Sequence, residues 1–311
     1  MSFATVLTAS RLPEKPWKTG AVVRLALCVL SSILMLGGLT AMVARYFETP
    51  QNSSPIVFVA LAVAAFVFTV AAMVMFFRSW SDDERYLFNL LVLLVCIYGG
   101  MIFLWLAGRL IHGKIELENQ VESMLIAVIT FQGTALVFVH FFLREHSMKW
   151  AQGFGLNLRP GHALLLGACV GILTPYPAWI LQDVSIRLFE TLRLHPQAQQ
   201  TVEILRHTIG LSGRITSGIA TIMIAPIGEE IIFRGIFYPW AKRKFSQQIA
   251  LWGTALLFGA VHANLASFIP LTLLAVVLVW LYEYTGTLLA PIAVHCVFNA
   301  ANFVALYYQR N

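Results

Sequence analysis

The sequence is poor in charged residues and in cysteine. Charged side chains make up 12% of its 311 residues and hydrophobic side chains 59%, whereas roughly a quarter of the residues of a typical soluble domain are charged. This scarcity of charge excludes a cytosolic globular protein and a disordered chain. The cysteines lie inside apolar stretches without a CxxC spacing, so we expect buried packing residues, and neither a disulfide scaffold nor a zinc ribbon. They are Cys28, Cys96, Cys169 and Cys296.

Apolar runs of about 20 residues, each long enough to cross a hydrocarbon core of about 30 Å, recur along most of the chain. The sequence therefore predicts an all-α fold, a polytopic transmembrane helical bundle of about eight spans with interfacial amphipathic helices. Two short runs, 248–264 and 269–284, are expected to form a hairpin that crosses the bilayer incompletely. The expected spans are 21–47, 56–77, 86–111, 121–143, 162–181, 214–240, 248–264, 269–284 and 288–308.

Lysine and arginine are concentrated in the loops on one side of these spans. In this position they orient the chain in the membrane, so the net charge of +6 does not indicate nucleic-acid binding. The positive-inside rule places the N-terminus in the cytoplasm, and we expect a multi-pass integral protein of a prokaryotic plasma membrane. The basic residues on the cytoplasmic side are Arg11, Lys15, Lys18, Arg78, Arg85, Arg144, Lys149, Arg159, Lys242, Arg243 and Lys244. Those on the opposite side are Arg109, Lys114, Arg187, Arg193 and Arg206.

The stretch 183–213 has the pattern of short amphipathic helices. Apolar residues recur at helical spacing among polar ones, first Val184, Leu188 and Leu192, and then Val202, Leu205 and Ile209. Two short helices that lie in the membrane interface would have this pattern, and a folded loop packed on the ends of the spans explains it equally well. Glu283, which lies between two tyrosines at a helix end, is also expected at the interface.

Three charged residues lie inside one apolar run, in the segment from Ala225 to Arg234. A charge near the bilayer centre costs at least about 2.5 to 3.5 kcal/mol, so such residues mark a functional site. Glu230 and Arg234 are four residues apart on the expected helix and can form an ion pair. Glu229 points about 100° away from Glu230, which leaves its carboxylate for another role. A purely structural ion pair is the alternative interpretation.

Polar residues recur in two later helices at a similar depth. His262 lies near the end of the run 248–264, and His295 and Asn299 share one helix face because they are four residues apart. From the cytoplasmic ends of their helices, Glu229, His262 and His295 lie about 20, 21 and 15 Å deep at 1.5 Å per residue. A carboxylate, two imidazoles and an amide can therefore converge from three helices. Taken singly, His262 could bond a core carbonyl, and Asn299 could join two helices.

This set of groups suits the hydrolysis of a peptide bond by an activated water molecule. Desolvation in an apolar pocket makes a carboxylate a competent general base, and a neighbouring histidine can share the proton and pass it to the leaving amine. A second histidine and an amide can donate hydrogen bonds to the oxyanion of the tetrahedral intermediate. No serine or cysteine in this region shows an equally clear base partner, so a covalent acyl-enzyme is not expected.

Three motifs, Glu229-Glu-x-x-x-Arg234, Phe258-x-x-x-His262 and His295-x-x-x-Asn299, resemble in order and spacing those of the CPBP (ABI) family of intramembrane proteases. That family includes the CAAX prenyl endopeptidases and bacterial members linked to bacteriocin processing and self-immunity. The resemblance covers about residues 159–308 and implies a glutamic-type intramembrane endopeptidase. The roles it implies are a water-activating base, Glu229, its partner, His262, oxyanion stabilisers, His295 and Asn299, and supporting residues, Glu230 and Arg234. We further expect Asn264 to orient the His262 ring or to line the pocket.

The resemblance divides the chain into three parts. Residues 1–20 are a cytoplasmic N-terminal segment, 21–158 form a four-helix transmembrane region of unknown role, and 159–311 form a CPBP-like protease core. The expected partners are the lipid bilayer and a membrane-anchored protein or peptide substrate. The sequence leaves open the oligomeric state and whether the substrate is prenylated, a leader peptide or a C-terminal tail.

Other functions compete with proteolysis by a metal-free site. No cofactor is expected, but a zinc protease is the alternative, with His262, His295 and Glu229 as ligands. Against zinc, the sequence has no HExxH motif, which fixes two ligands on one helix. A proton-coupled transporter would use Glu229 and the histidines as a relay, and a non-catalytic immunity or scaffold protein would tolerate Glu229→Gln.

Overall fold

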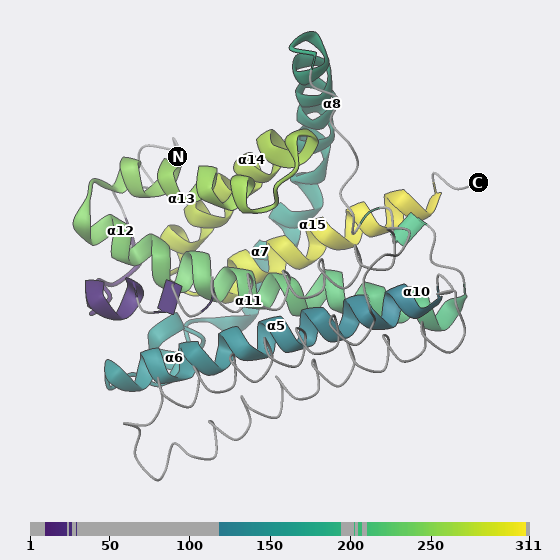
Figure 1. Ribbon diagram of the computed structural model, residues 1–311. Helices are drawn as coiled ribbons and strands as arrows, with labels where there is room; N and C mark the ends of the chain where they lie inside the picture. Colours follow the sequence, from purple (N-terminus) through teal and green to yellow (C-terminus); the bar gives the residue numbers. More distant parts are fainter. Residues whose placement is uncertain are drawn as a thin grey trace, which may run out of the picture. The chain divides into compact units, whose positions relative to one another are not determined.

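The computed structural model describes residues 10–23, 25–26, 29, 118–193, 202, 205–206 and 210–308, and all regular structure in these residues is helical (Figure 1). The predicted all-α class is therefore confirmed for this part of the chain. The elements are α5 (Glu118–Glu145), α6 (Trp150–Phe154), α7 (Pro160–Leu173), α8 (Pro175–Thr191), α10 (Leu211–Ile219), η2 (Ala220–Ile224), α11 (Ala225–Ile232), η3 (Phe233–Phe237), α12 (Tyr238–Lys244), α13 (Gln247–Val261), α14 (Leu265–Thr285) and α15 (Leu289–Tyr308).

The chain divides into two compact units, one of Met1–Val22 with His140–Asn311 and one of Val23–Val139. The packing and the site described below lie within the first unit. The expected spans 21–47, 56–77 and 86–111 lie almost entirely outside the described residues, and 121–143 forms part of α5.

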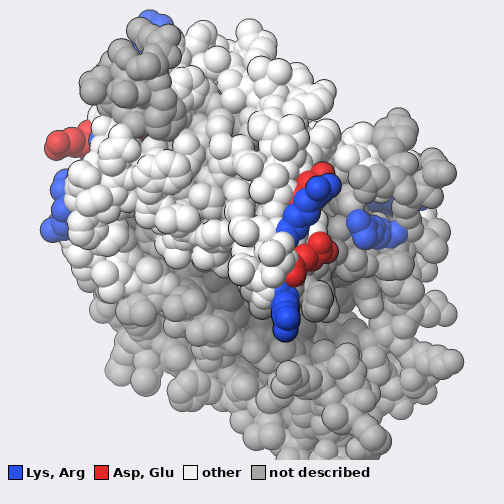
Figure 2. All heavy atoms as spheres, turned by 90° about the horizontal axis from the view of Figure 1, so that it is seen from above, with Lys and Arg blue, Asp and Glu red and all other residues white. Residues whose placement is uncertain are grey.

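Four helical stretches among the described residues are long and apolar enough to cross a membrane. They are Pro160–Thr191, Leu211–Lys244, Leu265–Thr285 and Leu289–Tyr307. In the view of Figure 2, uncharged side chains cover most of the described surface, and charged ones gather in a few places. A surface of this kind is suited to contact with lipid.

The sequence prediction misplaced two helix boundaries. α14 begins at Leu265 and has 21 residues, so it is long enough to cross a membrane, whereas α13 with 15 residues is short as expected. α8 continues beyond residue 181 to Thr191, because no glycine or proline interrupts this stretch. The first expected interfacial helix is thus the second half of α8, and the second, residues 202–209, lies mostly outside the described residues.

The expected burial of the cysteines is wrong for Cys169, which is exposed, and Cys296 is half-buried. Both are free thiols. α7 exposes apolar side chains such as Leu165 and Ile172, as a helix in contact with lipid does, so an apolar position on it need not be in the core. Cys28 and Cys96 lie outside the described residues.

Two π-helical segments, η2 and η3, interrupt the long helix Leu211–Lys244 on either side of α11. In η2 the hydrogen bond spans five residues, from the Ala225 N–H to the Ala220 carbonyl. A proline stands close after each segment, Pro226 after η2 and Pro239 after η3. Proline has no N–H to donate to the preceding turn, and π-helical turns are frequent at functional sites.

The two prolines release backbone carbonyls to side chains from other parts of the chain. The Ala225 N–H donates to the Ala220 carbonyl, and Pro226 has no N–H, so neither residue donates to the Thr221 carbonyl. The Thr221 carbonyl instead accepts a hydrogen bond from the Asn299 amide at 2.8 Å. Pro239 likewise leaves the Gly235 carbonyl to the indole N–H of Trp17, at 2.9 Å. The irregular helix is thereby tied to α15 at one end and to the N-terminal segment at the other.

Glycines let α7 lie directly against α15. A Cβ at Gly167 would collide with the Ala290 carbonyl oxygen, and one at Gly171 would come within 2.8 Å of Val297 Cβ. The spacing of four residues puts both glycines on one helix face, as in other close helix pairs of membrane proteins. This close packing positions α15, and with it His295.

The N-terminal segment, residues 10–18, lies against the ends of α12 and α14. The Arg11 N–H donates to the Glu283 carbonyl at 2.9 Å, and Lys242 Nζ donates to Ser10 Oγ at 3.2 Å. Trp17 is fully buried. These contacts join residues 10–18 to α12 and α14.

The side chain of Glu283 is 0% exposed, so protein groups surround it, and its expected position at the membrane interface stays a prediction. Its carboxylate accepts the Tyr238 hydroxyl at 2.6 Å and Lys242 Nζ at 2.7 and 2.9 Å. Tyr238 and Lys242 are four residues apart on α12, which puts both donors on one face next to the carboxylate. A buried charge needs such partners.

Candidate active site

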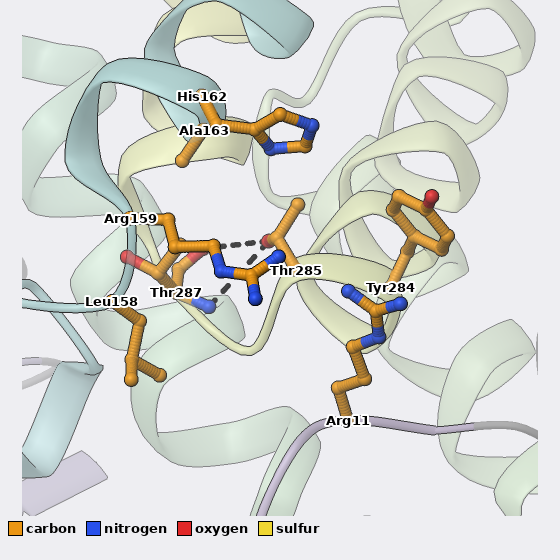
Figure 3. A pocket seen from close by; sticks show the side chains of 8 residues that line it. All are labelled: Arg11, Leu158, Arg159, His162, Ala163, Tyr284, Thr285 and Thr287. Carbon is orange, nitrogen blue, oxygen red and sulfur yellow. Dashed lines mark hydrogen bonds between the residues drawn. The ribbon is translucent and has the colours of Figure 1, made fainter.

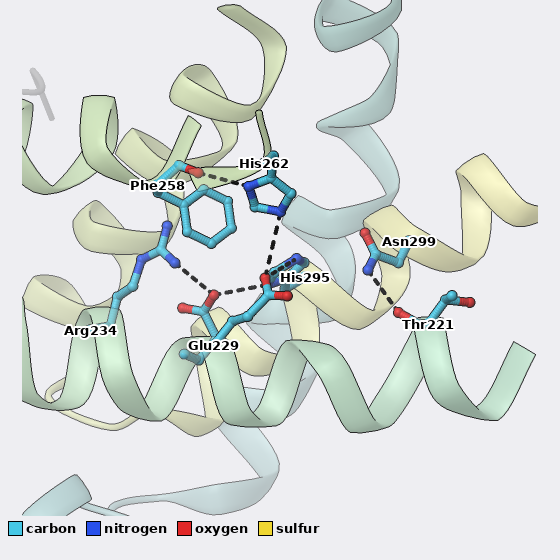
Figure 4. Close-up of polar contacts among 8 residues, drawn as sticks. Thr221, Glu229, Arg234, Phe258, His262, His295 and Asn299 are labelled. Carbon is cyan, nitrogen blue, oxygen red and sulfur yellow. Dashed lines mark hydrogen bonds and ion pairs between the residues drawn. The ribbon is translucent and has the colours of Figure 1, made fainter. Parts of the chain in front are cut away.

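Three helices bring the predicted site residues close together (Figure 4). α11 carries Glu229 and Glu230, His262 ends α13, and α15 carries His295 and Asn299. The residues come from segments up to 70 positions apart in the sequence. Their proximity therefore depends on how the helices pack.

Glu230, Arg234 and His295 form a buried ionic cluster. Arg234 Nη1 and His295 Nδ1 each lie 2.8 Å from Glu230 Oε1, and the three residues are 0%, 1% and 3% exposed. The predicted ion pair is thus confirmed, and the sequence did not predict its link to His295. Because an ionised carboxylate only accepts hydrogen bonds, His295 Nδ1 carries a hydrogen.

Glu229 lies beside this cluster, with a quarter of its side chain exposed. Its Oε2 atom is 3.8 Å from His295 Nε2 and 4.0 Å from His262 Nε2. Both distances exceed a direct hydrogen bond and suit groups that share a water molecule. The same oxygen is buried, and no hydrogen-bond donor reaches it from the described residues.

The peptide carbonyl of Phe258 fixes the His262 ring. His262 Nδ1 lies 2.7 Å from this oxygen, so Nδ1 carries the hydrogen and Nε2, the atom directed at Glu229, is an acceptor in the neutral ring. The turn that follows is closed by Ala263, whose φ is 48°. The end of α13 therefore determines both the position and the tautomer of the histidine.

The Phe258 ring packs against His262, His295 and Arg234. It is fully buried, and its centre lies 4.9 Å from the His262 ring, 5.7 Å from the His295 ring and 4.4 Å from Arg234 Cζ. The guanidinium thus gains a cation–π contact in addition to its ion pair. The sequence identified Phe258 only as part of a motif and did not reveal this contact.

Asn299 lies one helical turn beyond His295 on α15, and Figure 4 shows its amide directed at Thr221. The amide nitrogen donates to the Thr221 carbonyl at 2.8 Å, which uses one of its two hydrogens. The structure therefore gives Asn299 a role in joining α15 to η2. Its predicted role as an oxyanion stabiliser stays a prediction.

Asn264 caps α14. Its Oδ1 accepts the Ser267 N–H at 3.0 Å and the Ser267 hydroxyl at 2.8 Å, which is the common function of asparagine before a helix. The cap fixes the turn between His262 and α14. The prediction that Asn264 orients the His262 ring or lines the pocket stays a prediction.

The described part of the chain contains no group of three or more His, Cys, Asp or Glu side chains arranged to hold a metal ion. The zinc alternative, with Glu229, His262 and His295 as ligands, stays a prediction.

A helical bundle that gathers an ion pair, a further carboxylate and two imidazoles among helices long and apolar enough to cross a membrane has the features of an integral membrane protein. Residues 212–301 match the family described as type II CAAX prenyl endopeptidase Rce1-like. This part of the chain is a domain of that family, which is a family of peptidases. The match confirms the resemblance to CPBP proteases and includes every predicted site residue, although it is shorter than the expected 159–308.

One curated relative is the uncharacterized protein YpbD of Bacillus subtilis (strain 168). It is 33% identical over 84 residues, which make up 26% of this chain and 40% of the relative. The match thus spans less than half of either protein. No solved structure matches the chain.

Proposed function

We propose that the chain is an intramembrane endopeptidase that hydrolyses a peptide bond of a membrane-associated protein or peptide. The observation that carries the proposal is the position of Glu229 Oε2, 3.8 and 4.0 Å from the Nε2 atoms of two histidines. Residues 159–311 form the protease core in this proposal, and 21–158 form a further transmembrane region. Membership of residues 212–301 in a peptidase family supports the assignment.

In the proposed reaction, Glu229 is the general base. It removes a proton from a water molecule held between its Oε2 and His262 Nε2, and the resulting hydroxide forms a bond to the carbonyl carbon of the substrate. His262 Nε2 accepts a hydrogen bond because Nδ1 already donates to the Phe258 carbonyl. His262 Nε2 then takes up the proton from Glu229 and delivers it to the leaving nitrogen as the peptide bond breaks.

His295 and Asn299 stabilise the oxyanion in this proposal. His295 Nδ1 donates its hydrogen to Glu230, so a second hydrogen on Nε2, which could point at the oxyanion, is present only in the imidazolium form. The Asn299 amide contributes its second N–H, because the first is bonded to the Thr221 carbonyl. Donors fixed before the reaction are most effective in a site shielded from water.

The Glu230–Arg234 pair positions His295 and makes no contact with the substrate in this proposal. It lies on the closed side of the site, where both side chains are at most 2% exposed. Glu229 and His262 lie on the accessible side, each with 25% of the side chain exposed. The difference in burial assigns positioning to one pair and chemistry to the other.

We further propose an orientation with the N-terminus in the cytoplasm of a prokaryotic cell and about eight spans. Lys242 and the two basic residues after it end the long helix and, in this orientation, face the cytoplasm. The site then lies about 20 Å from that face along the helix. A membrane-anchored substrate reaches this depth without leaving the bilayer.

Comparison of the termini of membrane proteins in cells that carry the wild type, Glu229→Gln or Glu190→Gln tests the proposal. Glu190 is an exposed residue of α8, so Glu190→Gln is a matched control. A substrate should be cut with the wild type and with the control and remain uncut with Glu229→Gln. Identical termini in all three strains would contradict the proposal.

A chelator separates the proposed mechanism from a zinc protease. Cleavage of the identified substrate should persist in o-phenanthroline if Glu229 activates water without a metal. Loss of cleavage in the chelator, with recovery on addition of zinc, would assign the same residues as zinc ligands.

A further inference from the structure

A cavity of about 360 Å³ lies between the start of α7, the turn that joins α14 to α15, and the N-terminal segment. Figure 3 shows the side chains that line it. Its lining includes two arginines and a histidine, and none of the lining residues is acidic. Its polar lining residues are Arg11, Arg159, His162, Tyr284, Thr285 and Thr287.

The two arginines of the cavity come from the N-terminal segment and from the start of α7. Arg11 donates its N–H to the Glu283 carbonyl at 2.9 Å, and its guanidinium carbon lies 5.2 Å from the centre of the Tyr284 ring. Arg159 precedes α7 with φ at 42°, a left-handed backbone that residues other than glycine seldom adopt. Figure 3 shows the Arg159 guanidinium beside the Thr285–Thr287 turn and the His162 ring facing the same space.

The turn beneath these groups is closely packed and hydrogen-bonded. Gly286 has φ at 71°, and a Cβ at Gly155 would collide with the Gly286 carbonyl oxygen. Thr285 Oγ1 donates to the Leu281 carbonyl at 2.7 Å, which ties the turn to the last turn of α14. The cavity is thus preformed in the fold, so a ligand need not order it on binding.

Apolar helix surface begins directly beside the basic cavity. α7 starts at the cavity and exposes Leu164, Leu165, Ile172 and Leu173 along its length. A cluster of positive charge at the end of a transmembrane helix, followed by an apolar face, is complementary to a lipid with an anionic head and acyl chains.

We propose that this cavity binds the phosphate group of an anionic phospholipid in the cytoplasmic leaflet. The two guanidinium groups contact the phosphate, since arginine is well suited to bidentate recognition of this group. The acyl chains lie along the exposed face of α7. The site is separate from Glu229 and the histidines, and lipid binding does not depend on peptidase activity.

Native mass spectrometry of the purified full chain in detergent tests the proposal, with phosphatidylglycerol and phosphatidylcholine as probes. One basic group at an anionic lipid surface contributes about fivefold in affinity, so the double variant Arg11→Gln/Arg159→Gln should bind phosphatidylglycerol about 25-fold more weakly. Lys149→Gln/Lys244→Gln removes two exposed charges outside the cavity and should bind like the wild type. Phosphatidylcholine should bind weakly to all three proteins.

A charge-preserving variant keeps the test decisive if the glutamine variant does not fold. Arg11→Lys/Arg159→Lys should retain most of the affinity for phosphatidylglycerol. Glycerol phosphate, which carries the same anionic group without acyl chains, should not displace the lipid at millimolar concentration. Equal lipid affinity in the cavity variants and the wild type would overturn the proposal, and displacement by glycerol phosphate would replace the lipid with a soluble phosphate ligand.

Discussion

Glu230→Gln tests how the candidate site is held together. The substitution keeps the shape of the side chain and removes its charge, which leaves the Arg234 guanidinium without its ion-pair partner at 1% exposure. Removal of one partner from a buried ion pair destabilises proteins by about 3 to 5 kcal/mol. His295 also loses the charged acceptor of its Nδ1 hydrogen. We therefore expect a loss of at least about 3 kcal/mol in the free energy of unfolding.

The assay is reversible unfolding of the purified protein in mixed micelles. Arg234→Met and the double variant Glu230→Gln/Arg234→Met complete a double-mutant cycle. The double variant should be more stable than the sum of the single losses indicates, by about 2 kcal/mol, because it leaves no unpaired charge. Glu190→Gln, on the exposed surface of α8, should change stability by less than about 0.5 kcal/mol. Additive single losses, or a Glu230→Gln protein as stable as the wild type, would refute the reasoning.

Two further predictions concern packing and pH. Gly167→Ala should destabilise the protein by about 1 to 3 kcal/mol, because the added Cβ meets the Ala290 carbonyl. The control Gly161→Ala, on the same helix, adds a Cβ that meets nothing within 4 Å and should be neutral or stabilising. Equal thermal unfolding temperatures for the two variants would contradict this prediction. Burial lowers the pKa of Lys15 from 10.5 to about 8, so the unfolded chain binds more protons between these values and stability should rise with pH across this window. Lys15→Met should increase the free energy of unfolding at pH 7 by about 3 kcal/mol and abolish its increase with pH. Unfolding curves at pH 7 and pH 10 measure both effects. A variant with the same pH dependence as the wild type would refute the assignment.

The contacts that depend on spacing within one helix could be predicted from the sequence. Glu230 and Arg234 are four residues apart in a continuous apolar run, so their ion pair follows from helix geometry alone. The approach of His262 and His295 to Glu229 follows from their similar depth in three expected helices. These predictions need the period and rise of a helix but not the details of packing.

Contacts that depend on packing between helices could not be predicted in this way. His295 bonds to Glu230 because glycines let α7 and α15 approach closely, which sets the position of α15. Likewise, Tyr238 and Lys242 on α12 donate to the buried Glu283 carboxylate, and the residues next to Glu283 in the sequence did not indicate these partners. The two prolines in the long apolar run, Pro226 and Pro239, were a usable signal for the π-helical segments.

The rate of cleavage of a membrane-anchored substrate by purified protein in vesicles tests the central claim most directly. The substrate is the one that the comparison of termini identifies. The account predicts that Glu229→Gln lowers the rate at least about 100-fold, the usual contribution of a general base, while the free energy of unfolding changes little. A Glu229→Gln protein that folds normally and cleaves at the wild-type rate would contradict the claim that this carboxylate activates water.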